Sequence, residues 1–144
     1  MFFGEYEHAI DEKNRLTLPA RFRRELEDGV VITKGIDATL DVYPRERWTS
    51  VVESRLADLD PFARETRELQ RYFFSGAVAA APDRQGRVML PQRLLERTRL
   101  GREVVLVGVY DHLEIWDRAA WAEHLQGVEG RVDDVAERLA EKRS

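Results

Sequence analysis

Apolar and polar residues alternate with a period of two in several short segments, which is the pattern of strands with one buried face. The alternation is clearest at residues 15–18 and 87–90. Four further segments are rich in β-branched and aromatic residues and are also predicted to be strands, namely 30–34, 40–43, 104–107 and 113–116. Apolar residues recur instead at helical spacing in three segments, which predicts helices at 48–56, 62–73 and 132–139.

The strand segments occur in two copies because the chain contains an internal repeat. The stretch Asp11-Glu-Lys-Asn-Arg-Leu-Thr-Leu-Pro-Ala-Arg21 returns as Asp83-Arg-Gln-Gly-Arg-Val-Met-Leu-Pro-Gln-Arg93, at an offset of 72 residues. One residue is inserted after Gly101, and the similarity then continues at an offset of 73. The chain is therefore a duplicated unit.

Each copy predicts about four strands and one short helix, which begins at Pro19 or Pro91. A unit this small cannot bury both faces of its own sheet, so we expect the copies to interleave about a pseudo-twofold axis as one barrel or sandwich. The predicted fold class is α+β, built from two tandem βαβ-type half-domains. The expected divisions are a first repeat at 1–50, connecting helices at 51–75, a second repeat at 76–126 and a C-terminal helix at 127–144.

A tight hairpin turn is predicted between the first two strands of each repeat, because residues 5–10 and 76–81 lead into the turn and residues 15–18 and 87–90 follow it as the return strand. Aspartate at the first position of such a turn accepts hydrogen bonds from the following amides, and glycine or asparagine suits a left-handed fourth position. We therefore assign turn-forming roles to Asp11 and Asn14, and to Asp83 and Gly86. This role explains the two repeated aspartates more simply than a catalytic one.

The net charge of the 144 residues is −4, which taken alone argues against a polyanionic partner. The charges are unevenly distributed, however. Residues 13–24 carry +5 and residues 84–99 carry +4, so the rest of the chain carries −13. Two basic segments on an acidic body suit a protein that meets nucleic acid with one face, although solvated arginine-rich helices would give the same totals.

Motifs for catalysis and cofactor binding are absent from the sequence. It has no nucleophile elbow, phosphate-binding loop, dinucleotide fingerprint or zinc-protease helix, so no catalytic residue, cofactor or small-molecule ligand is predicted. There is no cysteine, and His8, His112 and His124 have no ligand spacing, so no metal site is predicted. With no apolar run of membrane-spanning length and no recognisable signal peptide, a cytoplasmic location is expected.

Arginine recurs at two equivalent positions in each repeat. Arg15 and Arg87 follow the turn directly, and Arg21 and Arg93 lie one turn into the next helix. Solvent exposure explains a charge at these positions but not the repeated choice of arginine, whose planar fork pairs with phosphate or a guanine edge. We therefore predict that Arg15 and Arg87 contact nucleic acid, with weaker support for Arg21 and Arg93.

The two Asp-x-x-(Asn/Gly)-Arg-x-x-Leu-Pro-x-Arg units and the N-terminus Met1-Phe-Phe-Gly-Glu-Tyr-Glu-His8 closely resemble the MraZ family, transcriptional regulators with two SpoVT/AbrB-type domains. The similarity covers essentially the whole chain. It implies a double swapped-hairpin, AbrB-like β-barrel with flanking helices, in chains that assemble into a ring-like homo-oligomer. It also implies nucleoid-associated binding of double-stranded DNA at short repeated promoter boxes upstream of the protein's own gene, at the head of the division and cell-wall gene cluster, usually as a repressor.

Carried over position by position, the resemblance implies a DNA-binding set that comprises Lys13, Arg15, Arg21, Arg23, Arg84, Arg87 and Arg93. The chain departs from the family pattern at Asn14, where the turn usually has glycine. Asparagine is the next-best residue for a left-handed position, so we expect the turn to form with a more restricted tip.

Three other functions are compatible with the sequence. The first is an oligomeric protein-interaction scaffold or antitoxin-like binding protein, whose arginines bind an acidic partner. The second is RNA binding through the same basic segments. The third and most remote is a cytosolic hydrolase, which would require a catalytic role for Asp83.

Overall fold

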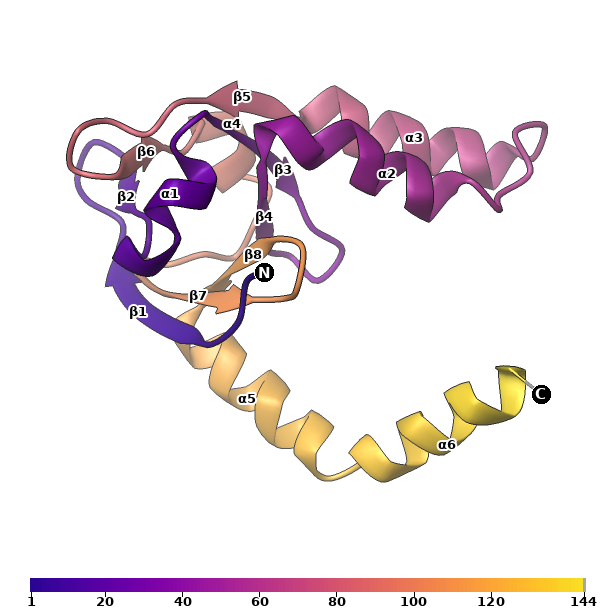
Figure 1. Cartoon of the computed structure of the whole chain (residues 1–144). Coiled ribbons are helices and arrows are strands. Elements are labelled where there is room, and N and C mark those ends of the chain that lie inside the picture. Colours follow the sequence, from indigo (N-terminus) through magenta and orange to yellow (C-terminus); the bar gives the residue numbers. More distant parts are fainter. Residues whose placement is uncertain (144) are drawn as a thin grey trace.

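The structure is a computed structural model that describes residues 1–143 (Figure 1). Eight strands form within these residues, and they are β1 (Glu5–Ala9), β2 (Arg15–Thr17), β3 (Val30–Lys34), β4 (Leu40–Pro44), β5 (Val78–Ala80), β6 (Arg87–Met89), β7 (Glu103–Gly108) and β8 (Leu113–Asp117). The six α-helices of the same residues are α1 (Arg23–Leu26), α2 (Trp48–Leu56), α3 (Arg64–Gly76), α4 (Gln92–Leu95), α5 (Arg118–Glu129) and α6 (Val132–Arg143). The 3₁₀ turns η1 (Ala20–Phe22) and η2 (Arg45–Arg47) precede α1 and α2. The mixed α+β class predicted from the sequence is confirmed.

Six strands form one antiparallel sheet in the order β1-β7-β8-β4-β3-β5. The two repeats exchange their outer strands, because β1 of the first repeat pairs with β7 of the second, and β5 of the second pairs with β3 of the first. The central strands β4 and β8 also join the two repeats. The repeats therefore share one sheet, as the sequence predicts.

The remaining strands, β2 and β6, form a two-stranded antiparallel ribbon. The prediction that each return strand pairs with the strand before its turn is wrong, since β1 pairs with β7 and β2 pairs with β6. Burial explains the difference. Leu16 on β2 and Val88 on β6 are 0% and 1% exposed, because the ribbon lies against the core of the sheet instead of extending a sheet edge.

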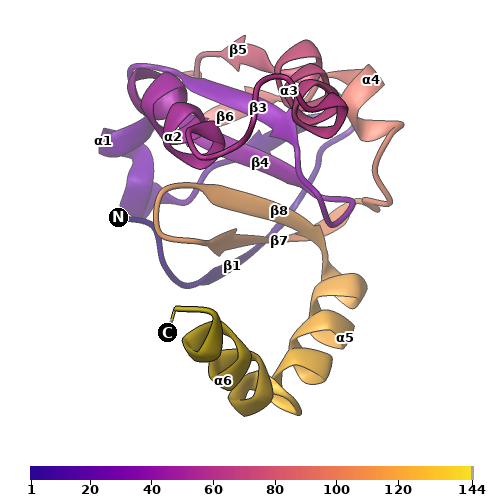
Figure 2. The ribbon, with the colours of Figure 1, turned by 90° about the vertical axis from the view of Figure 1, so that its right-hand side faces the viewer.

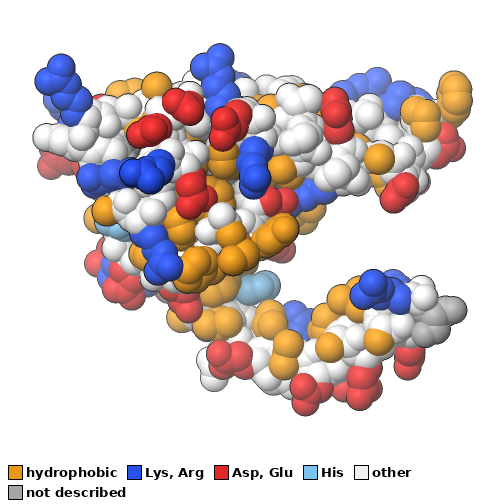
Figure 3. All heavy atoms as spheres, in the orientation of Figure 1, with side chains coloured by type: hydrophobic (Ala, Val, Ile, Leu, Met, Phe, Trp, Pro, Cys, Tyr) orange, Lys and Arg blue, Asp and Glu red, His pale blue; other side chains and the backbone are white. Residues whose placement is uncertain are grey.

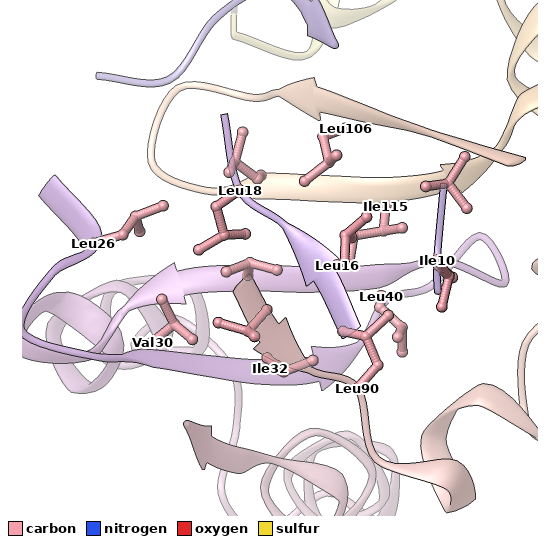
Figure 4. Packing of buried hydrophobic residues seen from close by; sticks show 14 of the residues in the cluster. Ile10, Leu16, Leu18, Leu26, Val30, Ile32, Leu40, Leu90, Leu106 and Ile115 are labelled. Carbon is pink, nitrogen blue, oxygen red and sulfur yellow. The ribbon is translucent and has the colours of Figure 1, made fainter. Parts of the chain in front are cut away.

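One hydrophobic core fills the space between the ribbon and the sheet (Figure 4). Leu16 and Leu18 enter it from the first repeat and Leu90 from the second, and Leu106 and Ile115 meet them from β7 and β8. Along β2 and the residue that follows it, buried Leu16 and Leu18 alternate with Arg15 and Thr17, which remain partly accessible. The period-two pattern therefore identifies the buried face of this strand correctly.

Helices flank the sheet on two sides (Figures 1 and 2). The helices α2 and α3 form a projecting pair beside β3, where the Thr33 hydroxyl donates to the carbonyl oxygen of Phe73 over 3.1 Å. The helix α5 leaves the end of β8, where the carboxylate of Asp117 accepts a hydrogen bond from the amide of Ala120, and α6 follows it. All three helices expected from apolar spacing are present. None of the helices in residues 1–143 is long and apolar enough to cross a membrane.

Candidate nucleic-acid interface

The two Asp-x-x-(Asn/Gly) turns have the same internal geometry. In the first turn, the amide of Asn14 donates to the carbonyl oxygen of Asp11 over 3.0 Å, and Oδ1 of Asp11 accepts from the amides of Lys13 and Arg15. In the second turn, Asp83 accepts the equivalent hydrogen bonds from Gly86, Gln85 and Arg87.

The fourth residue of each turn has a left-handed backbone, with φ of 61° at Asn14 and 78° at Gly86. Glycine adopts this conformation without steric cost, and asparagine tolerates it better than most residues do. The first turn therefore forms with asparagine where the second has glycine.

Each turn is bonded to the other repeat. The amide of Leu18, after β2, donates to the carbonyl oxygen of Gly86 over 2.8 Å. The amide of Leu90, after β6, donates to the carbonyl oxygen of Asn14 over 2.7 Å. The turn of one repeat thus fixes the strand that follows the turn of the other, which holds both turns at the ends of the same ribbon.

Ion pairs orient the first arginine after each turn. Nε of Arg15 donates to Oδ2 of Asp11 over 2.8 Å, and Nε of Arg87 donates to Oδ2 of Asp83 over 2.9 Å. The backbone amide of the same arginine also donates to each aspartate, and this hydrogen bond is the main reason that the pKa of both carboxyls lies below the usual 3.8. Within residues 1–143, no hydrogen bond or ion pair engages the terminal Nη nitrogens of either arginine. Their outer donors therefore remain available to a ligand.

The two arginines share one face of the ribbon. Arg15 lies opposite Met89, and Thr17 lies opposite Arg87, so these four side chains point away from the buried side of Leu16 and Val88. We call this surface the ribbon face. The strand geometry separates the Cα atoms of Arg15 and Arg87 by about 8 Å along the diagonal. Met89 is 60% exposed, which leaves the face open to solvent.

The other predicted DNA-binding residues surround the ribbon without ion pairs among residues 1–143, and all are exposed: Lys13, Arg21, Arg23, Arg84 and Arg93. The structure places Arg23 with the second turn and not the first, because it lines a crevice of about 230 Å³ with Arg84 and Gly86. Arg21 lies over the ring of Phe3, 4.1 Å from its centroid.

Acidic groups interrupt this basic surface. Figure 3 shows Lys and Arg side chains around the end of the molecule that carries β1, β2 and α1, with Asp and Glu side chains between them. The turns themselves also contain acids, since Asp11 and Asp83 pair with the ribbon arginines. The charge of each ribbon arginine is therefore partly compensated before any ligand binds.

One arginine that contacts the first turn was not predicted from the sequence. Nη1 of Arg102 donates to the carbonyl oxygen of Asp11 over 2.8 Å and to Oδ1 of Asn14 over 3.1 Å. Arg102 lies outside both basic segments, but it directly follows Gly101, where the second repeat has its inserted residue. The insertion was the signal in the sequence for this residue, and the side chain of Arg102 supports the turn of the opposite repeat.

A buried polar cluster lies apart from the ribbon and was also missed. Asp41 on β4 lies opposite Glu114 on β8, and His112 is next to both. Burial raises the pKa of Asp41 to about 7. Hydrogen bonds from His112 and Trp116 outweigh the burial of Glu114 and lower its pKa. The repeat alignment pairs Asp41 with Glu114 at the offset of 73, which was the signal for an acidic pair at the junction of the repeats.

Comparison with known proteins also finds two copies of one unit in the chain. A family model described as "MraZ protein, putative antitoxin-like" matches twice, at residues 1–72 and 73–142. A protein of Moorella thermoacetica named "Transcriptional regulator MraZ" is 47% identical over 142 residues, which is 98% of each chain. Proteins with the same name from Roseiflexus castenholzii and Clostridium acetobutylicum are 45% and 42% identical, over 99% and 98% of each chain.

Proposed function

This chain belongs to the MraZ family of transcriptional regulators, and from that premise we propose that it binds double-stranded DNA by placing the ribbon face in the major groove. The family is one of regulators and not of enzymes, in agreement with the sequence prediction. The observation that carries the proposal is the register of the ribbon, which sets Arg15 and Arg87 on one exposed face.

A two-stranded ribbon fits the width of the major groove, and arginine can donate two hydrogen bonds to a guanine edge there. The ion pairs with Asp11 and Asp83 hold the two guanidinium groups in place by Nε, so that the Nη nitrogens meet the DNA. The surrounding basic residues contact phosphates and fix the register on the duplex, and they are Lys13, Arg21, Arg23, Arg84 and Arg93.

One ribbon offers only two arginines, so each contact with a promoter box is weak. Several ribbons joined in a homo-oligomer bind successive boxes as an effectively intramolecular event. Exposed apolar residues on α6, namely Val132, Val135 and Leu139, support such an assembly. We follow the family resemblance in assigning a ring-like oligomer and a cytoplasmic, nucleoid-associated location.

The resemblance also supplies the regulated genes. The chain represses its own promoter and the adjacent division and cell-wall gene cluster, where an oligomer on repeated boxes blocks polymerase. The swapped-hairpin barrel of SpoVT/AbrB type is the fold proposed for this activity. The exchange of β1 and β5 between the repeats supports that fold.

The test is a titration of the DNA upstream of the native gene at several salt concentrations. Arg15→Ala should weaken binding and reduce its salt dependence, because a cation on the ribbon face is lost. Arg71→Ala is the matched control, since it removes an exposed arginine from α3, away from the ribbon. Equal affinities and salt slopes for wild type and Arg15→Ala would contradict the proposal.

The family model is described as antitoxin-like, which favours one alternative function. In this alternative, the chain is a scaffold whose arginines bind an acidic protein. Indifference to DNA together with co-purification of one acidic protein would select this function. RNA binding is separated from DNA binding by competition between duplex DNA and duplex RNA of the same sequence. In duplex RNA, the accessible base edges lie in the wide, shallow minor groove. Its shape differs from that of the DNA major groove, which a ribbon enters.

A further inference from the structure

The buried cluster of Asp41, His112 and Glu114 lies where the two repeats meet. Asp41 and Glu114 are directly opposite each other on β4 and β8, the central strand pair of the six-stranded sheet. Their neighbours Leu40 and Ile115 point into the main core, so the acidic side chains occupy the other face of the sheet. Two carboxylates directly opposite each other repel unless a cation lies between them.

The three side chains are close enough to share one ligand. One ligand atom from each, a carboxylate oxygen or an imidazole nitrogen, lies within 4.8 Å of the others. Asp41 is 8% exposed and His112 is 5% exposed, whereas the side chain of Glu114 is 24% exposed. The cluster is thus largely shielded from water, with access along Glu114.

Asp111 fixes the orientation of the imidazole. Its carboxylate accepts two hydrogen bonds from Nη2 of Arg55, at 2.8 and 2.9 Å, and lies 2.6 Å from Nδ1 of His112. A carboxylate held by arginine is an acceptor, so Nδ1 carries the proton. A metal ion would replace the proton that Nε2 shares with Glu114, and Nε2 would then present its lone pair to the ion, as in metal sites where a carboxylate orients the histidine from behind.

The carboxylate of Asp41 has almost no donor among residues 1–143. Its Oδ1 lies 3.5 Å from the hydroxyl of Thr39, and no residue of that range donates a hydrogen bond to Oδ2. Buried carboxylates in proteins are normally hydrogen-bonded, paired or bound to a metal. In Glu114, Oε1 accepts a 2.9 Å hydrogen bond from Nε1 of Trp116, so Oε2 is the oxygen that remains for a metal ion.

We propose that Asp41, His112 and Glu114 bind one divalent transition-metal ion of the zinc class. The distance of 3.4 Å between Nε2 of His112 and Oε2 of Glu114 is long for a hydrogen bond. It matches two ligands of one tetrahedral ion, which at about 2.1 Å from the metal are about 3.4 Å apart. One imidazole with two carboxylates suits zinc, whereas magnesium needs six oxygen ligands in octahedral geometry.

The ion would tie β4 of the first repeat to β8 of the second and so stabilise the junction of the repeats. Its role is structural and independent of the ribbon face, so it does not depend on the proposed DNA binding. The fourth ligand of a tetrahedral site is then water, which reaches the ion beside the partly exposed Glu114.

The test uses the full chain, stripped with a chelator and dialysed against Zn²⁺ or, separately, Mg²⁺. Wild type should retain one Zn²⁺ per chain with a higher Tm and should not retain Mg²⁺. Asp41→Asn and His112→Gln should lose this zinc, and Asp111→Asn should bind it about 10- to 100-fold more weakly. His8→Gln and His124→Gln are matched controls and should keep it.

Two results would overturn the proposal. One is the absence of stoichiometric zinc in wild type, and the other is equal retention by Asp41→Asn and His112→Gln. If a variant fails to fold, nitrogen-detected NMR of the wild-type histidines decides the question. A zinc-dependent shift of Nε2 of His112 supports the site, whereas protons on both ring nitrogens in the presence of zinc mean that a proton is the only cation there.

Discussion

The amide of Leu90 donates a 2.7 Å hydrogen bond to the carbonyl oxygen of Asn14, which belongs to the other repeat. The amide of Leu18 makes the corresponding bond with Gly86. Each repeat therefore completes the ribbon of the other, and neither arginine of the ribbon face is positioned by its own repeat alone.

The left-handed turn at Asn14 gives a first prediction about stability. Asn14→Gly and Asn14→Ala both remove the side-chain hydrogen bonds with Gln92 and Arg102. Only alanine places a Cβ at a φ of 61°, which costs about 1–2 kcal/mol. Chemical denaturation should therefore find Asn14→Ala less stable than Asn14→Gly by about that amount. Equal stabilities would mean that the turn rearranges when the asparagine is removed.

Base readout by the ribbon face gives a second prediction. Arg87→Lys keeps the charge but loses the planar fork, so it should lose about 1–3 kcal/mol of affinity for the native site if Arg87 reads a guanine edge. Its salt dependence should stay as in wild type, because the number of phosphate contacts is unchanged. Affinities for the native site and a scrambled duplex, measured at several salt concentrations, separate the two effects. Loss of affinity to the same extent on both duplexes would assign Arg87 to the phosphates.

The buried side of the ribbon gives a third prediction. Leu16 is 0% exposed and lies opposite Val88 beneath the ribbon, so Leu16→Ala should destabilise the fold by about 2–5 kcal/mol through the cavity it leaves. Thr17→Ala, one residue along on the ribbon face, should cost less than about 1 kcal/mol. Urea denaturation of the two variants tests the alternation directly. A smaller loss of stability for Leu16→Ala than for Thr17→Ala would mean that Thr17, and not Leu16, faces the core.

Sequence patterns predicted the local structure of this chain well, because turns and short strands depend on neighbouring residues. For example, the identities and spacing of Asp11 and Asn14 are enough to predict the turn that they form. They do not reveal which strand the next segment pairs with, because pairing depends on the core. Because Leu16 and Leu18 are buried against residues of both repeats, β2 pairs with β6 and not with β1.

The polar cluster illustrates the same limit for sites. Asp41 and Glu114 become neighbours only through the pairing of β4 with β8. Histidine spacing along the chain contains no trace of this contact, since Asp41 lies 71 residues before His112 and in the other repeat. Likewise, Arg102 reaches the first turn because β1 and β7 pair in the sheet.

The turn aspartates give a fourth prediction, on pH. The folded-state pKa of Asp11 and of Asp83 lies below the usual 3.8, chiefly because backbone amides donate to the ionised carboxylates. Their contribution to stability is therefore complete above about pH 3.8 and is lost as the pH falls through the lower, folded-state pKa values. The Tm of wild type should fall more steeply below pH 4 than that of Asp11→Asn/Asp83→Asn. Parallel profiles would show that other carboxylates govern unfolding in acid.

The exposed apolar face of α6 gives the last prediction. This helix has no buried residue, and Val132, Val135 and Leu139 are 52%, 37% and 58% exposed. An isolated helix of this length is marginal in water, so contact with a second chain would stabilise it. Val135→Glu should therefore lower the mass measured by light scattering without altering the fold of the sheet. Glu137→Lys, on the same helix, changes a charge while leaving the apolar residues in place and should keep the mass of wild type. The same mass for Val135→Glu and wild type would mean that α6 does not form the oligomer interface and that another surface does.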